Sequence, residues 1–267
     1  MKKIILNADD FGYRDDVSQA ILDSHIKGVL TSTTVLVNFI TDEYVEKAKQ
    51  VNTLGFGLHL NITSGNPLTN EWKDEYGSFT RPLRGKQGEF DRQNWIDFFK
   101  DINTEIVFKE YEAQYKQFVK IFDKEPTHID AHHYSGMYKK TLPAYLELAK
   151  KYNLRSRYPI SMDWAENQNI EQHAMSKVMR RNDLKETFIK SEIIIPSYQS
   201  TEFFHRYKNY LELIEYEISC INDGESIELF WHPGFEEKLR KDDYTMLVSD
   251  ELKNLLSKHN LVTYGAI

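Results

Sequence analysis

Apolar residues along this 267-residue chain alternate between short runs typical of buried strands and longer stretches with helical spacing. The predicted strands span residues 3–7, 31–38, 55–62, 128–132, 154–158, 192–195, 226–231 and 261–264. The predicted helices lie between them, at residues 15–27, 42–50, 95–122, 142–152, 203–219 and 252–259. This alternation indicates an α/β fold with seven or eight mostly parallel strands, closed or nearly closed into a barrel. A doubly wound open sheet is the alternative.

One stretch, residues 64–93, interrupts the alternation. It is rich in glycine and proline and contains Trp72, Tyr76 and Phe79. A long loop of this kind is usually functional or disordered, and the aromatic residues argue against disorder. We therefore predict an insertion that covers a binding site, with Trp72 as a candidate sugar contact. No repeat or linker divides the chain, so one domain over residues 1–267 is the simplest organisation. Residues 161–190 are polar and helix-prone, and the pattern does not place them.

Charge and cysteine content narrow the classes of partner. The chain has 34 Lys and Arg against 41 Asp and Glu, a net charge of −7, and no long basic run. Nucleic acid and anionic membranes are therefore poor partners. The single cysteine, Cys220, cannot form an internal disulfide, which fits a reducing compartment. Apolar runs are too short for a signal peptide or a membrane span, so we expect a soluble cytoplasmic protein.

The segment from His128 to His133 carries the strongest chemical signal. It contains three histidines and Asp130 within six residues. Strand alternation would place His128, Asp130 and His132 on one face. Imidazole and carboxylate groups clustered in this way suit a divalent metal.

Further polar residues occupy the carboxyl ends of predicted strands. Asp9 and Asp10 end the first strand, His59 lies near the end of the third, His132 ends the fourth, and His232 ends a later one. Active sites of parallel α/β folds assemble at this end of the sheet. Each residue alone has an ordinary structural explanation, but their shared position favours a common site.

These residues also differ in the chemistry they suggest. In an extended strand the adjacent Asp9 and Asp10 would point apart, so that one could bind metal and the other accept a proton. Gly57 shares a face with His59 and would leave room for a ligand. His232 precedes Pro-Gly, a fixed turn that makes it a plausible general acid.

Other motifs are absent or ambiguous. The chain has no dinucleotide or phosphate-binding glycine motif and no Gly-x-Ser-x-Gly nucleophile elbow. Arg155 and Arg157 lie on a predicted strand and could reach a substrate hydroxyl, a phosphate or a catalytic aspartate. Surface charge is the alternative for both.

Taken together, these segments resemble the YdjC-like carbohydrate deacetylases, which include the chitooligosaccharide deacetylases. The segments that carry the resemblance are NADDFG (7–12), TSTT (31–34), GLHL (57–60), PTHIDAHH (126–133) and HP (232–233). The resemblance implies that the chain folds as a distorted TIM-like barrel and removes an N-acetyl group from an amino sugar. Homodimers are also common in that family, so the resemblance implies a homodimer.

The same resemblance assigns roles to individual residues. It implies that Asp10, His59 and His132 bind one divalent metal ion, magnesium or zinc. It also implies that Asp9 is the general base and His232 the general acid.

One departure from the chitooligosaccharide branch concerns the substrate. That branch tends to continue the cluster as His-His-His-x-His, whereas Tyr134 and Gly136 stand at the last two positions here. The change falls where a sugar could be held, so a phosphorylated or shorter sugar is an alternative substrate. The candidate sugar contacts are His128, His133, Tyr134, Arg155 and Trp72.

Two competing functions share the same residues. A metal-dependent phosphoesterase acting on a sugar phosphate would often hold two or three metal ions with more ligands. A sugar-binding protein with a structural metal would have a closed shell of four ligands, whereas catalysis needs an open coordination position.

Overall fold

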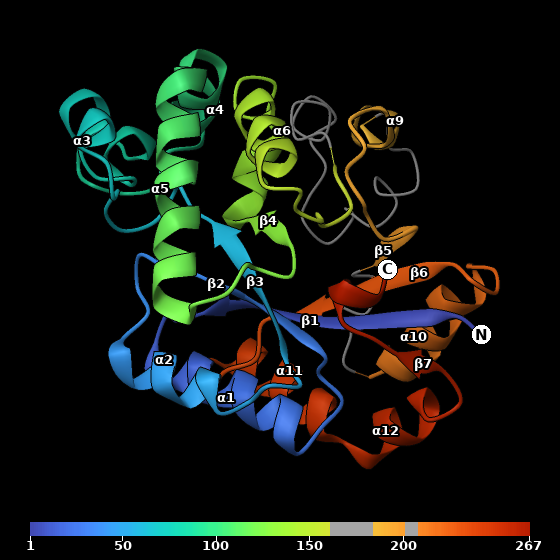
Figure 1. The fold of residues 1–267 in the computed structure, drawn as a ribbon. Helices are drawn as coiled ribbons and strands as arrows, with labels where there is room; N and C mark the ends of the chain where they lie inside the picture. Colours follow the sequence, from blue (N-terminus) through green and yellow to red (C-terminus); the bar gives the residue numbers. More distant parts are fainter. Residues whose placement is uncertain (161–183, 201–207) are drawn as a thin grey trace.

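The strand β1 (Lys3–Phe11) forms the centre of a curled sheet (Figure 1). The other strands are β2 (Ser32–Val35), β3 (Gly55–Leu60), β4 (Ile129–Ala131), β5 (Tyr198–Ser200), β6 (Ser226–Trp231) and β7 (Asn260–Leu261). Their order is β4-β3-β2-β1-β6-β5, with β7 also paired to β1, and all of these pairings are parallel. This computed structural model describes residues 1–160, 184–200 and 208–267.

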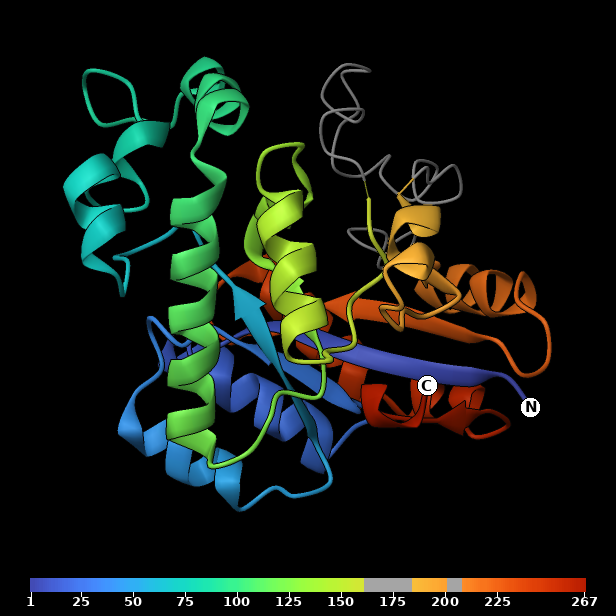
Figure 2. The ribbon, with the colours of Figure 1, turned by 45° about the horizontal axis from the view of Figure 1, so that its top comes forward.

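Helices cover the outside of the curled sheet. Their bounds are α1 (Asp15–Ile26), α2 (Asp42–Lys49), α3 (Asn70–Tyr76), α4 (Arg92–Asp101), α5 (Thr104–Phe122), α6 (Leu142–Lys151), α9 (Lys185–Lys190), α10 (Tyr210–Ser219), α11 (Lys238–Val248) and α12 (Asp250–Leu256). In both ribbon views α1 and α2 lie on one side of β1, while α5 and α6 stand on the other (Figures 1 and 2). The parallel half-barrel confirms the predicted α/β class, and its seven strands, counted among the described residues, agree with the predicted seven or eight.

The buried strands explain why the sequence reads as apolar runs. Ile4, Ile5, Leu6 and Ala8 of β1 all have no exposed surface. A parallel strand buried on both faces carries apolar residues continuously instead of alternating them with polar ones. Apart from Lys3 at its start, the polar residues of β1 lie towards its carboxyl end, from Asn7 to Asp10.

The barrel continues past β4 through isolated hydrogen bonds instead of full strands. Ile129 N donates to the Arg155 carbonyl at 2.9 Å, and Arg157 N donates to the Ile129 carbonyl at 3.0 Å. Ser156 N in turn donates to the Ile194 carbonyl at 2.9 Å. The strand predicted at 154–158 is therefore a single bridge. The strand predicted at 192–195 is irregular, and β5 follows it at Tyr198.

The insertion at residues 64–93 is folded, which corrects the prediction of a loop. It contains α3, the 3₁₀ turn η1 (Arg81–Leu83) and the start of α4. The Trp72 ring contacts Tyr76 and Phe79 at centroid distances of 5.1 and 5.0 Å and has no exposed surface. Trp72 therefore belongs to the hydrophobic core and offers no face to a sugar.

Glu110 on α5 holds the start of the insertion, and Asn103, just before α5, caps the helix. The Glu110 carboxylate accepts hydrogen bonds from Leu68 N and from both N and Oγ1 of Thr69. Asn103 caps α5, because its side chain accepts from Glu105 N at 2.9 Å. The helix predicted over 95–122 consequently divides into α4 and α5 at this cap.

Three further differences concern the second half of the chain. The helix predicted at 203–219 begins at Tyr210, and residues 201–207 lie outside the described residues. Most of the unplaced stretch 161–190 also lies outside them, apart from α9. The helix α11 was not predicted, because its sequence, KLRKDDYTMLV, carries few apolar residues.

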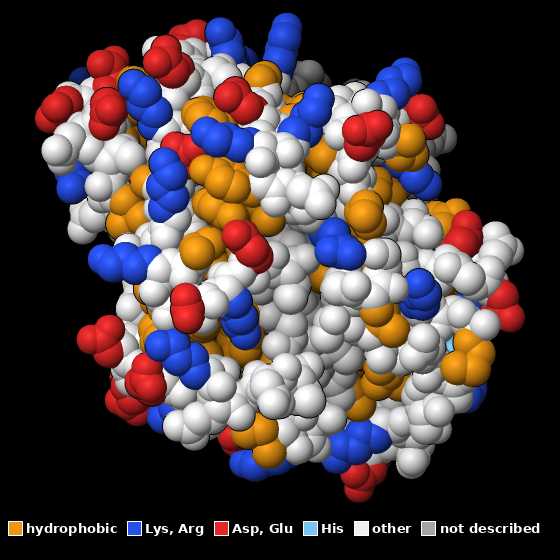
Figure 3. Space-filling view, viewed as in Figure 1, with side chains coloured by type: hydrophobic (Ala, Val, Ile, Leu, Met, Phe, Trp, Pro, Cys, Tyr) orange, Lys and Arg blue, Asp and Glu red, His pale blue; other side chains and the backbone are white. Residues whose placement is uncertain are grey.

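The surface carries both signs of charge. On the face shown in Figure 3, Lys and Arg side chains are interspersed with Asp and Glu. Among the described residues no helix is long and apolar enough to cross a membrane.

Candidate active site

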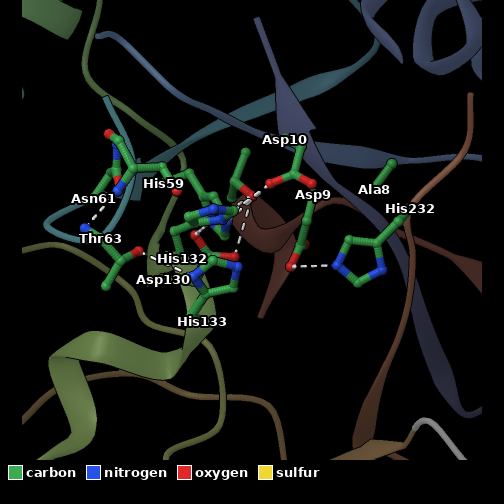
Figure 4. Close-up of polar contacts among 12 residues, drawn as sticks. Ala8, Asp9, Asp10, His59, Asn61, Thr63, Asp130, His132, His133 and His232 are labelled. Atoms are coloured by element: carbon green, nitrogen blue, oxygen red, sulfur yellow. Dashed lines mark hydrogen bonds and ion pairs between the residues drawn. The ribbon is translucent and has the colours of Figure 1, made fainter. Parts of the chain in front are cut away.

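Asp9 and Asp10 lie at the carboxyl end of β1, where the strand loses its regular form. The register between β1 and β2 shifts between Ala8 and Phe11, and Asp10 has a φ of 75°. A positive φ is unfavourable for a non-glycine residue and often marks a functional position. The two carboxylates face different partners, Asp10 towards His59 and His132 and Asp9 towards His232 (Figure 4).

Asp10, His59 and His132 form one compact cluster. Asp10 Oδ1 lies 3.1 Å from His132 Nδ1 and 3.5 Å from His59 Nε2, and the two nitrogens are 3.2 Å apart. One donor atom from each residue lies within 4.8 Å of the others, and all three side chains are buried. Two imidazoles and one carboxylate oxygen converging in this way fit a divalent cation.

Asp130 orients His59 for that role. Its Oδ1 lies 2.5 Å from His59 Nδ1, and its Oδ2 accepts from the Thr34 hydroxyl at 3.1 Å. Histidines that bind metal commonly donate their second nitrogen to a carboxylate in this way. Although burial alone would lower the pKa of His59, Asp130 and Asp10 raise it to about 10. Metal binding must therefore displace a proton from this ring.

Arg157 neutralises a second group of carboxylates. Its guanidinium contacts Asp9 at 2.6 Å, Glu228 at 2.8 Å and Asp130 at 2.9 Å, and the side chain is buried. Asp9, His59 and Asp130 also have donor atoms close enough for a metal. Arg157 contacts two of these three residues, Asp9 and Asp130, whereas an arginine contacts the Asp10 cluster only at Asp10 Oδ2 and leaves Oδ1 facing the histidines. The Asp10 cluster is therefore the better cation site.

The same arginine keeps Asp9 ionised. Burial by itself raises the pKa of Asp9, but the Arg157 guanidinium outweighs it and holds the pKa well below its usual range. Asn7 Nδ2 also donates to Asp9 Oδ1 at 2.8 Å. Asp9 is thus a fixed, negatively charged acceptor beside Asp10, His59 and His132, which we call the metal-type cluster.

His232 stands on the other side of Asp9, at the end of β6. Its Nε2 lies 3.8 Å from Asp9 Oδ2, and its side chain is 27% exposed. Its backbone N–H donates to Asp243 Oδ2 at 2.8 Å, which anchors the turn after β6. Burial lowers the pKa of His232, although Asp9 and Asp10 oppose that shift. An imidazolium with a lowered pKa releases its proton readily.

His133 and Tyr134 follow the cluster in strained backbone conformations, with φ values of 55° and 53°. His133 is exposed, and its ring stacks on His132 at a centroid distance of 3.8 Å. A hydrogen bond of 3.0 Å joins His133 Nδ1 to the Thr63 hydroxyl (Figure 4). The Tyr134 ring lies 6.5 Å from Phe230, and its hydroxyl is buried without a hydrogen-bond partner. The structure therefore brings both residues to the site.

Two other candidate sugar contacts lie elsewhere. His128 is completely buried and stacks on Tyr264 at a centroid distance of 3.6 Å. A Cβ atom on Gly57 would lie 2.4 Å from the His128 ring, so Gly57 makes room for this histidine instead of a ligand. Arg155 Nε donates to the carbonyl of Ile267 at 3.3 Å. Of the two arginines considered, it is Arg157 that reaches the aspartate.

Sequence patterns missed two charged residues of the site. Arg240 on α11 donates from Nη2 to Asp10 Oδ2 at 2.7 Å, and Glu228 contacts Arg157 from β6. Arg240 lies in a stretch with no motif. Glu228 interrupts an apolar strand, and this could have indicated a buried ion pair.

This chain matches known proteins over nearly its whole length. The model of the YdjC-like protein family matches residues 3–258. This chain belongs to the YdjC-like family. A carbohydrate deacetylase 2 from Listeria innocua is 28% identical, with 99% of this chain and 98% of that protein covered. A carbohydrate deacetylase from Vibrio cholerae is 28% identical, with 97% and 93% covered.

A solved structure extends the similarity of this YdjC-like chain to three dimensions. It comes from Enterococcus faecalis V583 and is provisionally named a cellobiose-phosphate cleavage protein. The TM-score is 0.74 at 28% identity, and 99% of this chain and 98% of that chain are covered. The fold, including the strands that carry the site, is therefore shared over the whole length.

Glu228 provides a test of the buried charges around Arg157. Burial raises the pKa of Glu228 from 4.5 to about 7, although Arg157 opposes the shift. Its contribution to the free energy of unfolding is complete below the unfolded pKa and is lost as the pH rises through about 7. We expect Glu228→Gln to gain stability relative to the wild type as the pH rises from 4.5 to about 7, with little further change above, as measured by urea unfolding at each pH. A stability difference that does not change with pH would contradict this assignment.

Proposed function

We propose that this protein is a metal-dependent hydrolase that removes the N-acetyl group from an acetylated amino sugar or short oligosaccharide. The observation that carries the proposal is the Asp10, His59 and His132 cluster with Asp9 and His232 beside it. Three protein ligands leave an open coordination position, as catalytic metal sites require. The relatives named carbohydrate deacetylases support the same activity.

The cofactor is one divalent cation, magnesium or zinc. Two imidazole ligands favour zinc, because magnesium prefers oxygen ligands. When bound, the cation supplies Lewis acidity, which polarises an amide carbonyl and makes water more acidic.

Asp9 acts as the general base in this proposal. Arg157 keeps it ionised and fixes both of its oxygens, at 2.6 and 2.7 Å. The carboxylate can therefore accept a proton from the attacking water without changing its position.

His232 acts as the general acid. Amide hydrolysis expels an amine, which is a poor leaving group until it is protonated. His232 Nε2 lies 3.8 Å from Asp9 Oδ2, so base and acid flank one small region beside the cluster. Its partial exposure leaves one side of the ring accessible to a substrate.

A screen for acetate release tests the proposal. The substrates are N-acetylated mono- and disaccharides, with and without a phosphate group, in the presence of added magnesium, zinc or cobalt. We expect metal-dependent release of acetate. Release of phosphate in place of acetate would instead support the phosphoesterase. Metal binding without any turnover would support a sugar-binding protein.

Location and assembly complete the proposal. We place the protein in the cytoplasm, because its single cysteine fits a reducing compartment. The family resemblance supports a homodimer, and light scattering of the purified protein tests it.

A line of aromatic rings leads from the site to the insertion and suggests where a second sugar lies. Trp95 lies 6.0 Å from His133, and Phe90 lies 5.7 Å from Trp95, between ring centroids. Phe90 is 62% exposed. Aromatic rings offer apolar faces on which sugar rings can stack.

We expect Phe90→Ala to raise KM for an N-acetylated disaccharide about fivefold, corresponding to about 1 kcal/mol. The KM for the monosaccharide should stay unchanged, because in this proposal the reacting sugar lies at the cluster and only the second sugar stacks on Phe90. The matched control is Tyr216→Ala, which removes an aromatic ring that is 53% exposed on α10. Equal effects on both substrates would place the sugar elsewhere.

A further inference from the structure

Arg240 joins the metal-type cluster from a helix that carries none of its ligands. Its Nη2 donates to Asp10 Oδ2 at 2.7 Å, and its side chain is only 14% exposed. The other oxygen of Asp10 faces His132 Nδ1 at 3.1 Å and His59 Nε2 at 3.5 Å. The two oxygens of one carboxylate are thus divided between an arginine and the histidine pair.

The turn after β6 holds Arg240 in place. Gly234 N donates to the Arg240 carbonyl at 3.1 Å, and Arg240 Nη1 lies 3.5 Å from the His232 carbonyl. A Cβ atom on Gly234 would lie 3.0 Å from the Cβ and Cδ atoms of Arg240, so glycine permits this close approach. Glu237 Oε2 lies 3.8 Å from Arg240 Nε. The arginine is therefore anchored to the turn that carries His232.

The charge of Arg240 argues against a simple role in metal affinity. A positive charge beside a cation site repels the cation and weakens its binding. A guanidinium bonded to one oxygen of a carboxylate also fixes the orientation of that carboxylate. The second effect gives Asp10 one defined position in which only Oδ1 points at the histidines.

We propose that Arg240 is a positioning residue that reserves Asp10 Oδ2, so that Asp10 offers a metal ion a single oxygen. Its hydrogen bond also withdraws electron density from the carboxylate, which leaves a bound cation more electrophilic. Through the same side chain, the ligand on β1 is linked to the turn that positions His232. The expected effect on turnover rests on the proposed function, whereas the effect on metal binding does not.

The test uses Arg240→Met and Arg240→Lys, with Co²⁺ as the probe. Methionine keeps an unbranched stem but frees Oδ2, so Asp10 can bind Co²⁺ through both oxygens. We expect Co²⁺ affinity to be unchanged or up to about tenfold tighter, with an altered visible absorption spectrum. We also expect kcat for acetate release to fall at least about tenfold while KM stays within about threefold. Lysine, which keeps the charge, should restore part of kcat.

Arg14→Met is the matched control. Arg14 contacts Glu237 at 2.6 Å and Asp16 at 2.8 Å, so it also supports this region, but within the described part of the chain its ion pairs are with these two acids and not with Asp10. We expect its Co²⁺ affinity, Co²⁺ spectrum and kcat to match the wild type. Thermal unfolding of each variant establishes that it is folded.

The outcomes separate this inference from the proposed function. If Arg240→Met binds Co²⁺ more than tenfold more weakly, or gives the wild-type Co²⁺ spectrum, Arg240 does not reserve an oxygen and the inference is overturned. If the wild type releases no acetate but Arg240→Met still shows the altered spectrum and undiminished affinity, the inference stands and the proposed function fails.

Discussion

Replacement of Asp9 by asparagine is expected to reduce kcat for acetate release by about 10²–10⁴-fold, the usual contribution of a general base. Asparagine has nearly the same shape but cannot accept the proton. Metal binding should persist, because the ligands Asp10, His59 and His132 are untouched. Steady-state kinetics together with elemental analysis of the purified variant measure both effects. Near wild-type turnover would remove Asp9 from the role of base.

Glu228→Gln is the control for the loss of an Arg157 partner. Both variants remove one carboxylate from the buried arginine, but only Asp9 lies beside His232 and the metal-type cluster. We expect Glu228→Gln to lose less than about tenfold in kcat. If the two variants lose turnover equally, the effect belongs to the arginine network and not to proton transfer.

Replacement of His132 by alanine is expected to weaken metal binding by more than about 100-fold. Loss of an outer partner of a metal ligand already costs about 10–100-fold, and loss of a direct ligand costs more. Competition with a chelating indicator gives the dissociation constant. Undiminished metal occupancy would exclude His132 from the ligand set.

His133→Ala is the matched control for that variant. His133 is the adjacent residue and stacks on His132, yet it does not belong to the cluster of donor atoms. We expect it to keep its metal while KM for the sugar rises. Weakened metal binding in both variants would indicate a general disruption of the turn after β4.

Several of the site residues could be identified from the sequence because parallel strands end at a common edge. Asp9, Asp10, His59 and His232 each follow or end an apolar run, and such runs identify buried strands. The resemblance then separated the roles of the two aspartates, which periodicity alone left open. The structure brings the three candidate ligands together, and their functions remain predictions for the experiments above.

Periodicity was misleading where two interpretations give the same pattern. The Trp72 side chain in a glycine-rich stretch could face a sugar or a local core, and the rings of Tyr76 and Phe79 pack around it. Gly57 could make room for a ligand or for a neighbouring side chain, and the His128 ring fills that space. The position of Trp72 depends on local packing that residue type does not specify. The space beside Gly57 depends on His128, a neighbour that is distant in sequence.

Hydrophobic periodicity predicted the α/β class, the strands β1 to β4 and β6, and the polar residues at their carboxyl ends, because this periodicity follows from local backbone geometry. It missed β5, and it predicted a strand at 154–158 where the structure has a single bridge. Contacts between distant parts of the chain determine that Arg157 and not Arg155 reaches Asp9, and that Arg240 reaches Asp10. Residues 155 and 157 are equivalent by strand alternation, and Arg240 is separated from Asp10 by 230 positions. Which charges meet depends on the curl of the sheet and the packing of α11, and these are set by contacts over the whole chain.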